Sequence, residues 1–231
     1  MRGHLRKWLL VAAMPEAAPQ RARCSISASY DEEDSVVIPD LEGMNDNCNG
    51  LAVIGLSGPI AAGKTTAGMH LRALGFHYAR YSSVVAEVAR DAGREPTRST
   101  LQEIGRQIHE TLGQRWLGQK LLERLPKSGC LVIDGMRYPE DHAFLTESFG
   151  PCFRHIAITA PLDIRRQRFL RSRPADDYDE AVTHPSELGV ENVVQFAHRV
   201  IDNEGSEEQF LASLDLAVSE LVDKSRTPKY L

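Results

Sequence analysis

The sequence lacks the features that mark membrane proteins, zinc proteins and disulfide-rich secreted domains. Its 231 residues include four cysteines, at positions 24, 48, 130 and 152, and none of them forms a C-x-x-C pair or lies beside a histidine at zinc-ligand spacing. We therefore expect free, mostly buried thiols in a reducing compartment. The longest apolar run near the start covers residues 8–14, which is too short to cross a bilayer.

The sequence also lacks the excess of basic residues that is typical of nucleic-acid-binding proteins. Lysine and arginine number 27 against 32 acidic residues, so that the formal net charge is -5. This balance argues against a nucleic-acid partner, although it leaves room for a local basic patch. Apolar residues make up 42% of the chain, which is enough to bury a full hydrophobic core. One domain with a tail is the expected organisation.

The first 43 residues differ in composition from the rest. Residues 2–23 hold five basic side chains and one acidic one, whereas residues 31–42 hold six acids. A disordered tail, a targeting peptide and an upstream start codon are three competing interpretations. Because the apolar run is short and the composition changes abruptly, we favour a tail or a mis-assigned start. The folded domain is then expected at 44–231, in the cytoplasm.

Beyond residue 50, strand and helix patterns alternate. Buried strands are expected near residues 51–56, 76–81, 130–133, 154–159 and 200–202. Helices are expected between them, with Ser82 at the start of one, a capping box from Ser99 to Gln102 on the next and another from Ser206 to Gln209 on the last. This alternation predicts a three-layer α/β fold with a parallel sheet of about five strands.

One motif identifies a phosphate-binding loop. The segment 58–66 reads GPIAAGKTT and satisfies G-x-x-x-x-G-K-[ST] in full, with a strand before it and a helix after it. Its backbone N–H groups and the positive end of the helix are expected to bind the phosphates of ATP. We assign the phosphates to Gly58, Ala61, Ala62, Gly63, Lys64, Thr65 and Thr66. Lys64 is expected to contact the β- and γ-phosphates, and Thr65 to bind Mg²⁺.

An acidic residue and an arginine follow the strand at 130–133. Asp134 stands where that strand ends, at the edge of a parallel sheet that faces the ligand, and we expect it to help bind Mg²⁺. Arg137 follows three residues later, and its planar guanidinium suits a phosphate. We therefore expect Arg137 to bind a phosphate in the same crevice.

The order of several short motifs resembles the P-loop monophosphate kinases. Residues 134–139 are similar to the D-G-x-x-R element of adenylate-kinase-like enzymes and to the D-x-R-x-x-x-E element of deoxynucleoside monophosphate kinases, with Glu140 one place off. Four further features resemble the deoxynucleoside monophosphate kinases: R-x-x-L-Q-x-x-G at 98–105, Trp116, H-x-S-E at 184–187 and N-x-G-[ST] at 203–206. The resemblance covers residues 51–222. It implies that Arg137 holds the acceptor's phosphate, and that Asn203 and Gly205 lie against the adenine.

The resemblance fails after the second strand. Adenylate kinases carry T-G-D and then an arginine there, whereas this chain has Tyr81, Ser82 and Ser83, with Glu87 where the arginine is expected. The acceptor therefore cannot be held as it is in adenylate kinases. We expect Arg98 and Arg106 to bind it in place of the missing arginine.

An arginine-rich segment follows the fourth strand. Arg165, Arg168 and Arg171 are spaced by three residues, roughly along one helix face. Such a helix can close over the phosphates as a lid and stabilise the moving phosphoryl group. The alternative is an exposed face whose arginines pair with the acids at 176–180.

Together these features predict ATP- and Mg²⁺-dependent phosphoryl transfer to a nucleoside monophosphate, with deoxynucleotides among the candidate acceptors. The expected catalytic residues are Lys64, Arg137, Arg165, Arg168 and Arg171. No general base is expected, because a phosphate acceptor is already anionic. Two alternatives stay open: a kinase of another small molecule such as dephospho-coenzyme A, which would need a carboxylate base, and a nucleotide-sensing NTPase module. A small-molecule partner is expected, and neither nucleic acid nor membrane.

Overall fold

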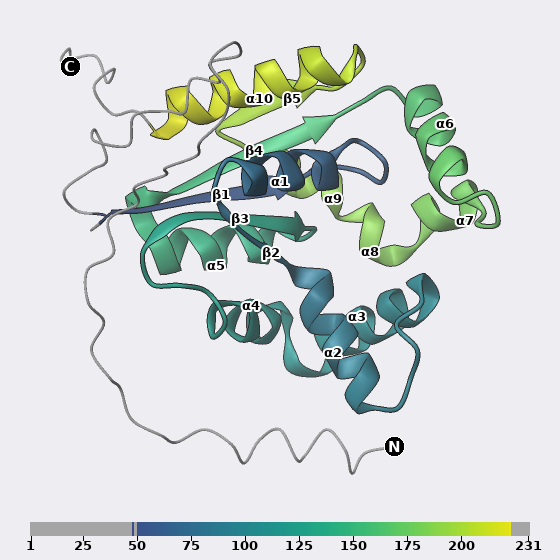
Figure 1. The fold of residues 1–231 in the computed structure, drawn as a ribbon. Coiled ribbons are helices and arrows are strands. Elements are labelled where there is room, and N and C mark those ends of the chain that lie inside the picture. Colours follow the sequence, from purple (N-terminus) through teal and green to yellow (C-terminus); the bar gives the residue numbers. More distant parts are fainter. Residues whose placement is uncertain (1–47, 49, 223–231) are drawn as a thin grey trace, which may run out of the picture.

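The computed structural model describes residue 48 and residues 50–222 (Figure 1). The predicted tail, residues 1–43, lies outside the described residues. Within the described part of the chain, no helix is long and apolar enough to cross a membrane.

Five parallel strands form one sheet in the order β2-β3-β1-β4-β5, which confirms the predicted fold class. The strands are β1 (Leu51–Ser57), β2 (His77–Arg80), β3 (Gly129–Met136), β4 (Phe153–Thr159) and β5 (Arg199–Asp202). Strand β1 lies at the centre and is buried from Ala52 onward. Such a continuous buried run is typical of a parallel strand that is covered on both faces.

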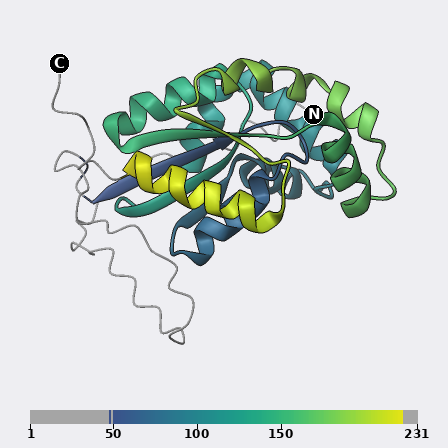
Figure 2. The same cartoon turned by 90° about the horizontal axis from the view of Figure 1, so that it is seen from above.

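Helices cover both faces of the sheet, as Figures 1 and 2 show. On one face pack α1 (Lys64–Ala73) and α10 (Glu207–Val222). On the other face pack α2 (Tyr81–Asp91), α3 (Arg98–Leu112), α4 (Gln114–Leu122), α5 (Pro139–Phe149) and α9 (Val190–Val194). The strands therefore contribute alternate side chains to two separate hydrophobic cores.

Three further helices lie at the carboxyl end of the strands: α6 (Leu162–Ser172), α7 (Tyr178–Thr183) and α8 (Pro185–Leu188) (Figure 1). In a parallel sheet this edge is where ligands bind, because the loops that follow the strands meet there. The phosphate loop, Asp134, Arg137 and the arginine-rich helix all belong to this edge.

Two of the predicted helix starts are wrong by one or two residues. Helix α2 begins at Tyr81, before Ser82. Helix α3 begins at Arg98, because the hydroxyl of Thr97 accepts the N–H of Thr100, so that Ser99 and Gln102 form no capping box. The last capping box is confirmed, since Ser206 N–H donates to the Gln209 side chain and Gln209 N–H to the Ser206 hydroxyl.

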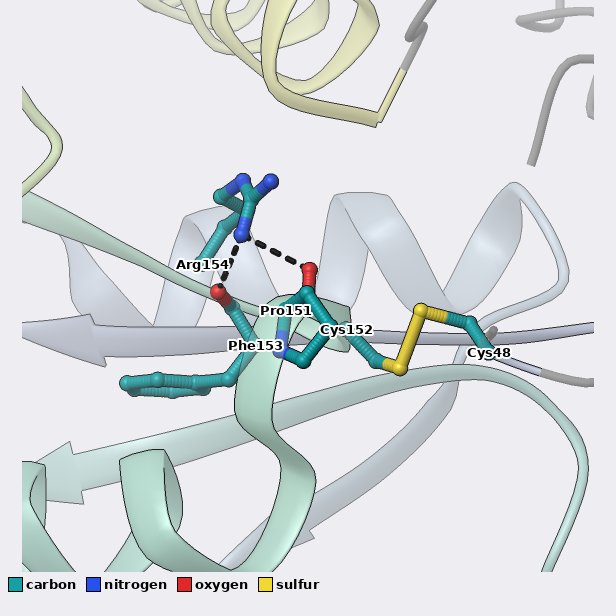
Figure 3. Close-up of a disulfide and its surroundings, with 5 residues drawn as sticks. All are labelled: Cys48, Pro151, Cys152, Phe153 and Arg154. Carbon is teal, nitrogen blue, oxygen red and sulfur yellow. Dashed lines mark hydrogen bonds between the residues drawn. A yellow bond between two sulfur atoms is a disulfide. The ribbon is translucent and has the colours of Figure 1, made fainter. Parts of the chain in front are cut away.

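The prediction of free thiols is wrong for two of the four cysteines. Cys48 and Cys152 form a disulfide across 104 positions of sequence (Figure 3). Cys48 precedes β1, and Cys152 ends the short 3-10 helix η4 (Gly150–Cys152), which leads into β4. Because β1 and β4 are neighbours, the bridge joins two adjacent strands at their amino ends, the edge opposite the phosphate loop.

Reduction of this disulfide should destabilise the fold. A cross-link that closes a loop of about 100 residues stabilises a protein by up to about 4–5 kcal/mol in the chain-entropy model. Urea unfolding of the wild type should therefore shift to lower urea when dithiothreitol is added. The Cys152→Ser variant should already be destabilised, and the reductant should leave its midpoint unchanged. Equal midpoints for wild type and variant without reductant would contradict the bridge.

Candidate functional site

The phosphate loop turns sharply between β1 and α1, and two glycines make this turn sterically accessible. Gly58 has a φ of 136°, and a Cβ at this position would lie 2.0 Å from the carbonyl oxygen of Ile158 in β4. Gly63 has a φ of 113°, and a Cβ there would lie 2.4 Å from Nδ2 of Asn203. Both positions therefore require glycine. Ala61 also adopts a positive φ, of 59°, so the loop is tightly wound.

Substitution of Gly58 tests this packing. Gly58→Ala should lower the free energy of unfolding by about 3 kcal/mol or more, because the new methyl group meets backbone rather than a movable side chain. Gly105→Ala is the matched control, since a Cβ in that part of α3 meets nothing within 4 Å. The control should be neutral or more stable by up to about 1 kcal/mol. Equal denaturation midpoints for the two variants would refute the close approach.

Lys64 begins α1 and bends back over the loop. Its Nζ donates to the carbonyl oxygens of Gly58 at 2.6 Å and of Pro59 at 2.8 Å. Burial lowers the pKa of Lys64 to about 8, against the opposing effect of the carboxylates of Asp134 and Glu187. The ammonium therefore lies in a partly desolvated site in which nearby negative charge stabilises it.

Thr65 and Asp134 are brought together through a residue that the sequence did not single out. Tyr78, on β2, donates its hydroxyl to Oδ2 of Asp134 at 2.7 Å and is also hydrogen-bonded to Thr65. Its ring packs against Gly68 of α1, where a Cβ would lie 2.4 Å away. Burial, together with the adjacent Asp134 carboxylate, raises the pKa of Tyr78, so the hydroxyl remains a donor.

The other contact of Asp134 is electrostatic. Nε of Arg80 lies 3.6 Å from Oδ2 of this almost fully buried carboxylate. The oxygens of Thr65 and Asp134 are hard donors of the kind that Mg²⁺ prefers. No group of three or more His, Cys, Asp and Glu side chains in the described ranges is arranged to hold a metal ion by itself.

Arg137 follows β3 and is held by a buried carboxylate. Asp141, in the first turn of α5, accepts the backbone N–H of Arg137 at 2.9 Å and of Tyr138 at 3.1 Å, and an amide N–H of Gln114 at 2.6 Å. These bonds fix the turn that aims Arg137 along the sheet edge. Burial raises the pKa of Asp141 to about 6, although the hydrogen bonds oppose this shift.

The raised pKa of Asp141 predicts a specific pH dependence. Because the folded protein binds this proton more tightly than the unfolded chain, the stability that Asp141 contributes is full below about pH 4. It is lost as the pH rises to about 6, by about 3 kcal/mol. Asp141→Asn lacks this titration, so its unfolding free energy relative to wild type should improve across that window. Urea unfolding at pH 4, 5, 6 and 7 measures the difference. A pH-independent difference would refute the assignment.

A carboxylate from α8 lies at the centre of the charged groups. Glu187 forms an ion pair with NH1 of Arg137, and its side chain is only 6% exposed. The same carboxylate acts on the pKa values of Lys64, Arg98 and His184. Glu187 therefore interacts electrostatically with residues up to 123 positions away in sequence, from Lys64 of the phosphate loop to Arg137 after β3.

Two of the acceptor candidates, Arg98 and Arg106, come from α3. Burial lowers the pKa of Arg98, and the charges of Arg173 and Arg137 add to this effect. Nε of Arg98 is buried without a hydrogen-bond partner. Arg106 is half-buried and pairs with Glu110 at 2.7 Å, one helical turn further on. Both arginines act on the pKa of His184, so they border the same region as Glu187.

The arginines of α6 have different surroundings. Arg165 donates from Nε to the Ala160 carbonyl at 2.9 Å and acts on the pKa of Lys64. Arg168 is bound to Asn203, whereas Arg171 is exposed. Arg166 pairs with Asp179, as expected for a salt-bridged face. The pairing of Arg166 is that of a salt-bridged face, whereas the lid role of Arg165, Arg168 and Arg171 stays a prediction.

Helix α6 also packs directly on the phosphate loop. Phe169 is fully buried and forms a small hydrophobic cluster with Ile60 of the loop and with Tyr178 and Ala181 of α7. The guanidinium of Arg98 lies 5.3 Å from the centre of the Phe169 ring. The described structure therefore has α6 closed onto both the loop and α3.

Asn203 links the loop after β5 to the phosphate loop. Its side chain donates to the Ala62 carbonyl at 2.9 Å, and its own carbonyl groups accept from Arg168 at 2.9 and 3.1 Å. Gly205 lies further out, against the side chain of Gln209. Asn203 is thus a contact between α6 and the phosphate loop, which its assignment to an adenine loop did not anticipate.

Residues that sequence reasoning did not assign to the site are Tyr78, Asp141 and Glu187. Glu187 stood within the H-x-S-E resemblance but was given no role. Asp141 carried a signal, since an acidic residue in the first turn after Pro139 is a common helix-start pattern. Tyr78 carried none, because only the pairing of β2 with β3 places it beside Asp134.

The sheet order and the glycine loop define the class of protein as one with a P-loop nucleotide-binding fold. Two solved structures have this fold, and each is covered over 98% of its length by 74% of this chain. They are TT1252 from Thermus thermophilus, with a TM-score of 0.53 and 20% identity, and a shikimate kinase from Bacteroides thetaiotaomicron, with a TM-score of 0.51 and 16% identity.

Within this class, the chain belongs to the UPF0200 family. A UPF0200 protein of Aeropyrum pernix is 30% identical over 164 residues, which are 68% of this chain and 86% of the relative. A UPF0200/UPF0201 protein of Archaeoglobus fulgidus is 28% identical over 174 residues, 71% of this chain. The chain spans only 54% of the length of that second relative. No family model matches the chain.

Proposed function

We propose that this chain is a phosphotransferase that uses Mg-ATP to phosphorylate a nucleoside monophosphate. The observation that carries the proposal is the meeting of Lys64 of the phosphate loop with Arg137 and Arg165 in one electrostatic cluster. A loop that only binds a triphosphate needs Lys64, whereas a transfer site needs further cations for the moving phosphoryl group and for a second substrate.

The donor half of the site consists of the loop and the start of α1. Gly58, Ala61, Ala62, Gly63 and Thr66 offer backbone N–H groups to the ATP phosphates. Lys64 would leave the carbonyls of Gly58 and Pro59 and bind the phosphates. The oxygens of Thr65 and Asp134 fit Mg²⁺, which when bound neutralises charge on the β- and γ-phosphates. Asn203 and Gly205 remain proposed neighbours of the adenine.

The acceptor half consists of Arg98, Arg106 and Arg137. The positive charges of all three arginines lower the pKa of His184, so all three lie near this residue, although two come from α3 and one follows β3. Arg98 has an unpaired, buried Nε that an acceptor phosphate would satisfy. Arg165, Arg168 and Arg171 complete the proposed site as a lid, with Arg165 nearest to Lys64.

A nucleotide-sensing NTPase module is the alternative from another functional class. Such a module holds one nucleotide and has no use for a second set of phosphate-binding arginines. The half-buried Arg98 therefore favours the transferase, because its buried Nε has no hydrogen-bond partner and such burial costs stability unless a ligand satisfies it.

Product analysis tests the proposal. Purified protein is incubated with Mg-ATP and a panel of ribo- and deoxynucleoside monophosphates, and ADP and phosphorylated acceptor are quantified. One or more monophosphates should be phosphorylated. Lys64→Ala should lower kcat at least about 100-fold, because it removes the cation that stabilises the transferred group. Lys127→Ala, at an exposed position before β3, is the matched control and should keep wild-type activity. Formation of ADP without any phosphorylated acceptor would refute the transferase.

A further inference from the structure

The buried side chain of Glu187 is difficult to explain if the acceptor atom is a phosphate oxygen. Its carboxylate forms an ion pair with Arg137 and is 6% exposed. It lies close enough to Lys64 to raise the pKa of that ammonium. A γ-phosphate bound by Lys64 and an acceptor phosphate bound by Arg137 would both meet this negative charge. Like charges in a partly desolvated site repel each other, so Glu187 would oppose a phosphate-to-phosphate transfer.

The same carboxylate suits a hydroxyl acceptor. A hydroxyl is a weak nucleophile at neutral pH and needs a group that takes its proton as the new bond forms. Asp134 and Glu187 are the two carboxylates that act on Lys64. Oδ2 of Asp134 accepts a hydrogen bond from Tyr78 and lies beside Arg80, next to the proposed Mg²⁺ site. Glu187 comes from a different element, α8, and forms its ion pair with Arg137 on the acceptor side.

The positions of the arginines are compatible with an acceptor that carries both a phosphate and a hydroxyl group. Arg98 and Arg106 come from α3, and both act on His184, three residues before Glu187. They can hold the phosphate of a nucleoside monophosphate while its sugar points toward Glu187 and Lys64. In Figure 1, α8 lies between α3 and the α6–α7 pair at the carboxyl end of the sheet, where both substrates would have to meet.

We propose that Glu187 is the catalytic base, and that the phosphoryl group is transferred to a hydroxyl of the acceptor's sugar. This inference rests on the proposed phosphotransferase function. The hydroxyl oxygen forms a bond to the γ-phosphorus while the bond from that phosphorus to the β–γ bridging oxygen breaks. ADP leaves with the electron pair of the broken bond. The hydroxyl proton passes to the Glu187 carboxylate and then to solvent. Arg137 keeps the carboxylate aligned through the ion pair.

The chemical nature of the product distinguishes the two acceptor atoms. Wild-type protein is incubated with Mg-ATP and a monophosphate other than AMP that the protein phosphorylates in the panel. The product formed from this monophosphate is separated from ADP and ATP and analysed by ³¹P NMR. Transfer to the sugar gives a second phosphomonoester signal, whereas transfer to the phosphate gives the coupled signals of a phosphoanhydride. The matching 2′,3′-dideoxynucleoside monophosphate, which lacks both hydroxyls, should not be phosphorylated. A phosphoanhydride product, or full activity on the dideoxy compound, overturns the inference while leaving the phosphotransferase intact.

Variants of Glu187 test its role as the base. Glu187→Gln should lower kcat about 10²- to 10⁴-fold. The affinity for Mg-ATP, measured by calorimetry without acceptor, should stay within about threefold of wild type, because the fold and the donor site are retained. Glu187→Asp should recover part of the rate. Glu191→Gln, at an exposed position of α9, is the matched control and should behave as wild type.

Two outcomes overturn the role of Glu187. One is a Glu187→Gln variant whose kcat lies within about threefold of wild type. The other is a variant that loses Mg-ATP affinity together with activity, which would show that the ion pair only supports the fold. If the wild type phosphorylates no acceptor in the panel, the proposed function fails first, and the inference fails with it.

Discussion

The charged site depends on a balance between one partly desolvated ammonium and the carboxylates around it. Burial lowers the pKa of Lys64 to about 8, and Asp134 and Glu187 act against this shift. The positive charges of Arg137 and Arg165 also lower the pKa of Lys64, so the two carboxylates offset both burial and these arginines. The two carboxylates come from β3 and α8, so the packing of both elements helps to keep Lys64 charged.

The parts of this structure that the sequence predicted are those in which the signal is local. Strand β1 is an uninterrupted apolar run, and the glycines of the phosphate loop stand at fixed spacing beside Lys64 and Thr65. The backbone geometry of the loop requires glycine at position 58, because a Cβ there would lie too close to the carbonyl oxygen of Ile158. The fold class and the position of the phosphate loop could therefore be derived before any contact was known, whereas the functional roles of the site residues remain predictions.

The remaining features depend on contacts between distant segments. The disulfide joins Cys48 to Cys152 across 104 positions, and spacing alone cannot tell a bridge from free thiols when no short motif is present. The ring of His155 lies 5.3 Å from that of His142 and is hydrogen-bonded to Ser57 at the end of β1, a contact between segments 98 positions apart. Burial lowers the pKa of His155 to about 3, so this imidazole is a neutral part of the core.

The arginine-rich helix α6 is attached to the phosphate loop by both polar and apolar contacts. Arg168 binds Asn203, which in turn binds the Ala62 carbonyl, so that α6 is attached to the phosphate loop through polar bonds that face the ligand edge. Phe169 adds an apolar contact with Ile60. The polar attachment runs through Asn203, whose own N–H donates to the carbonyl of Thr159 at the end of β4, whereas the apolar attachment is made to the phosphate loop itself. A change in the conformation of the phosphate loop would therefore alter the support of α6 directly, through Ile60 and Asn203.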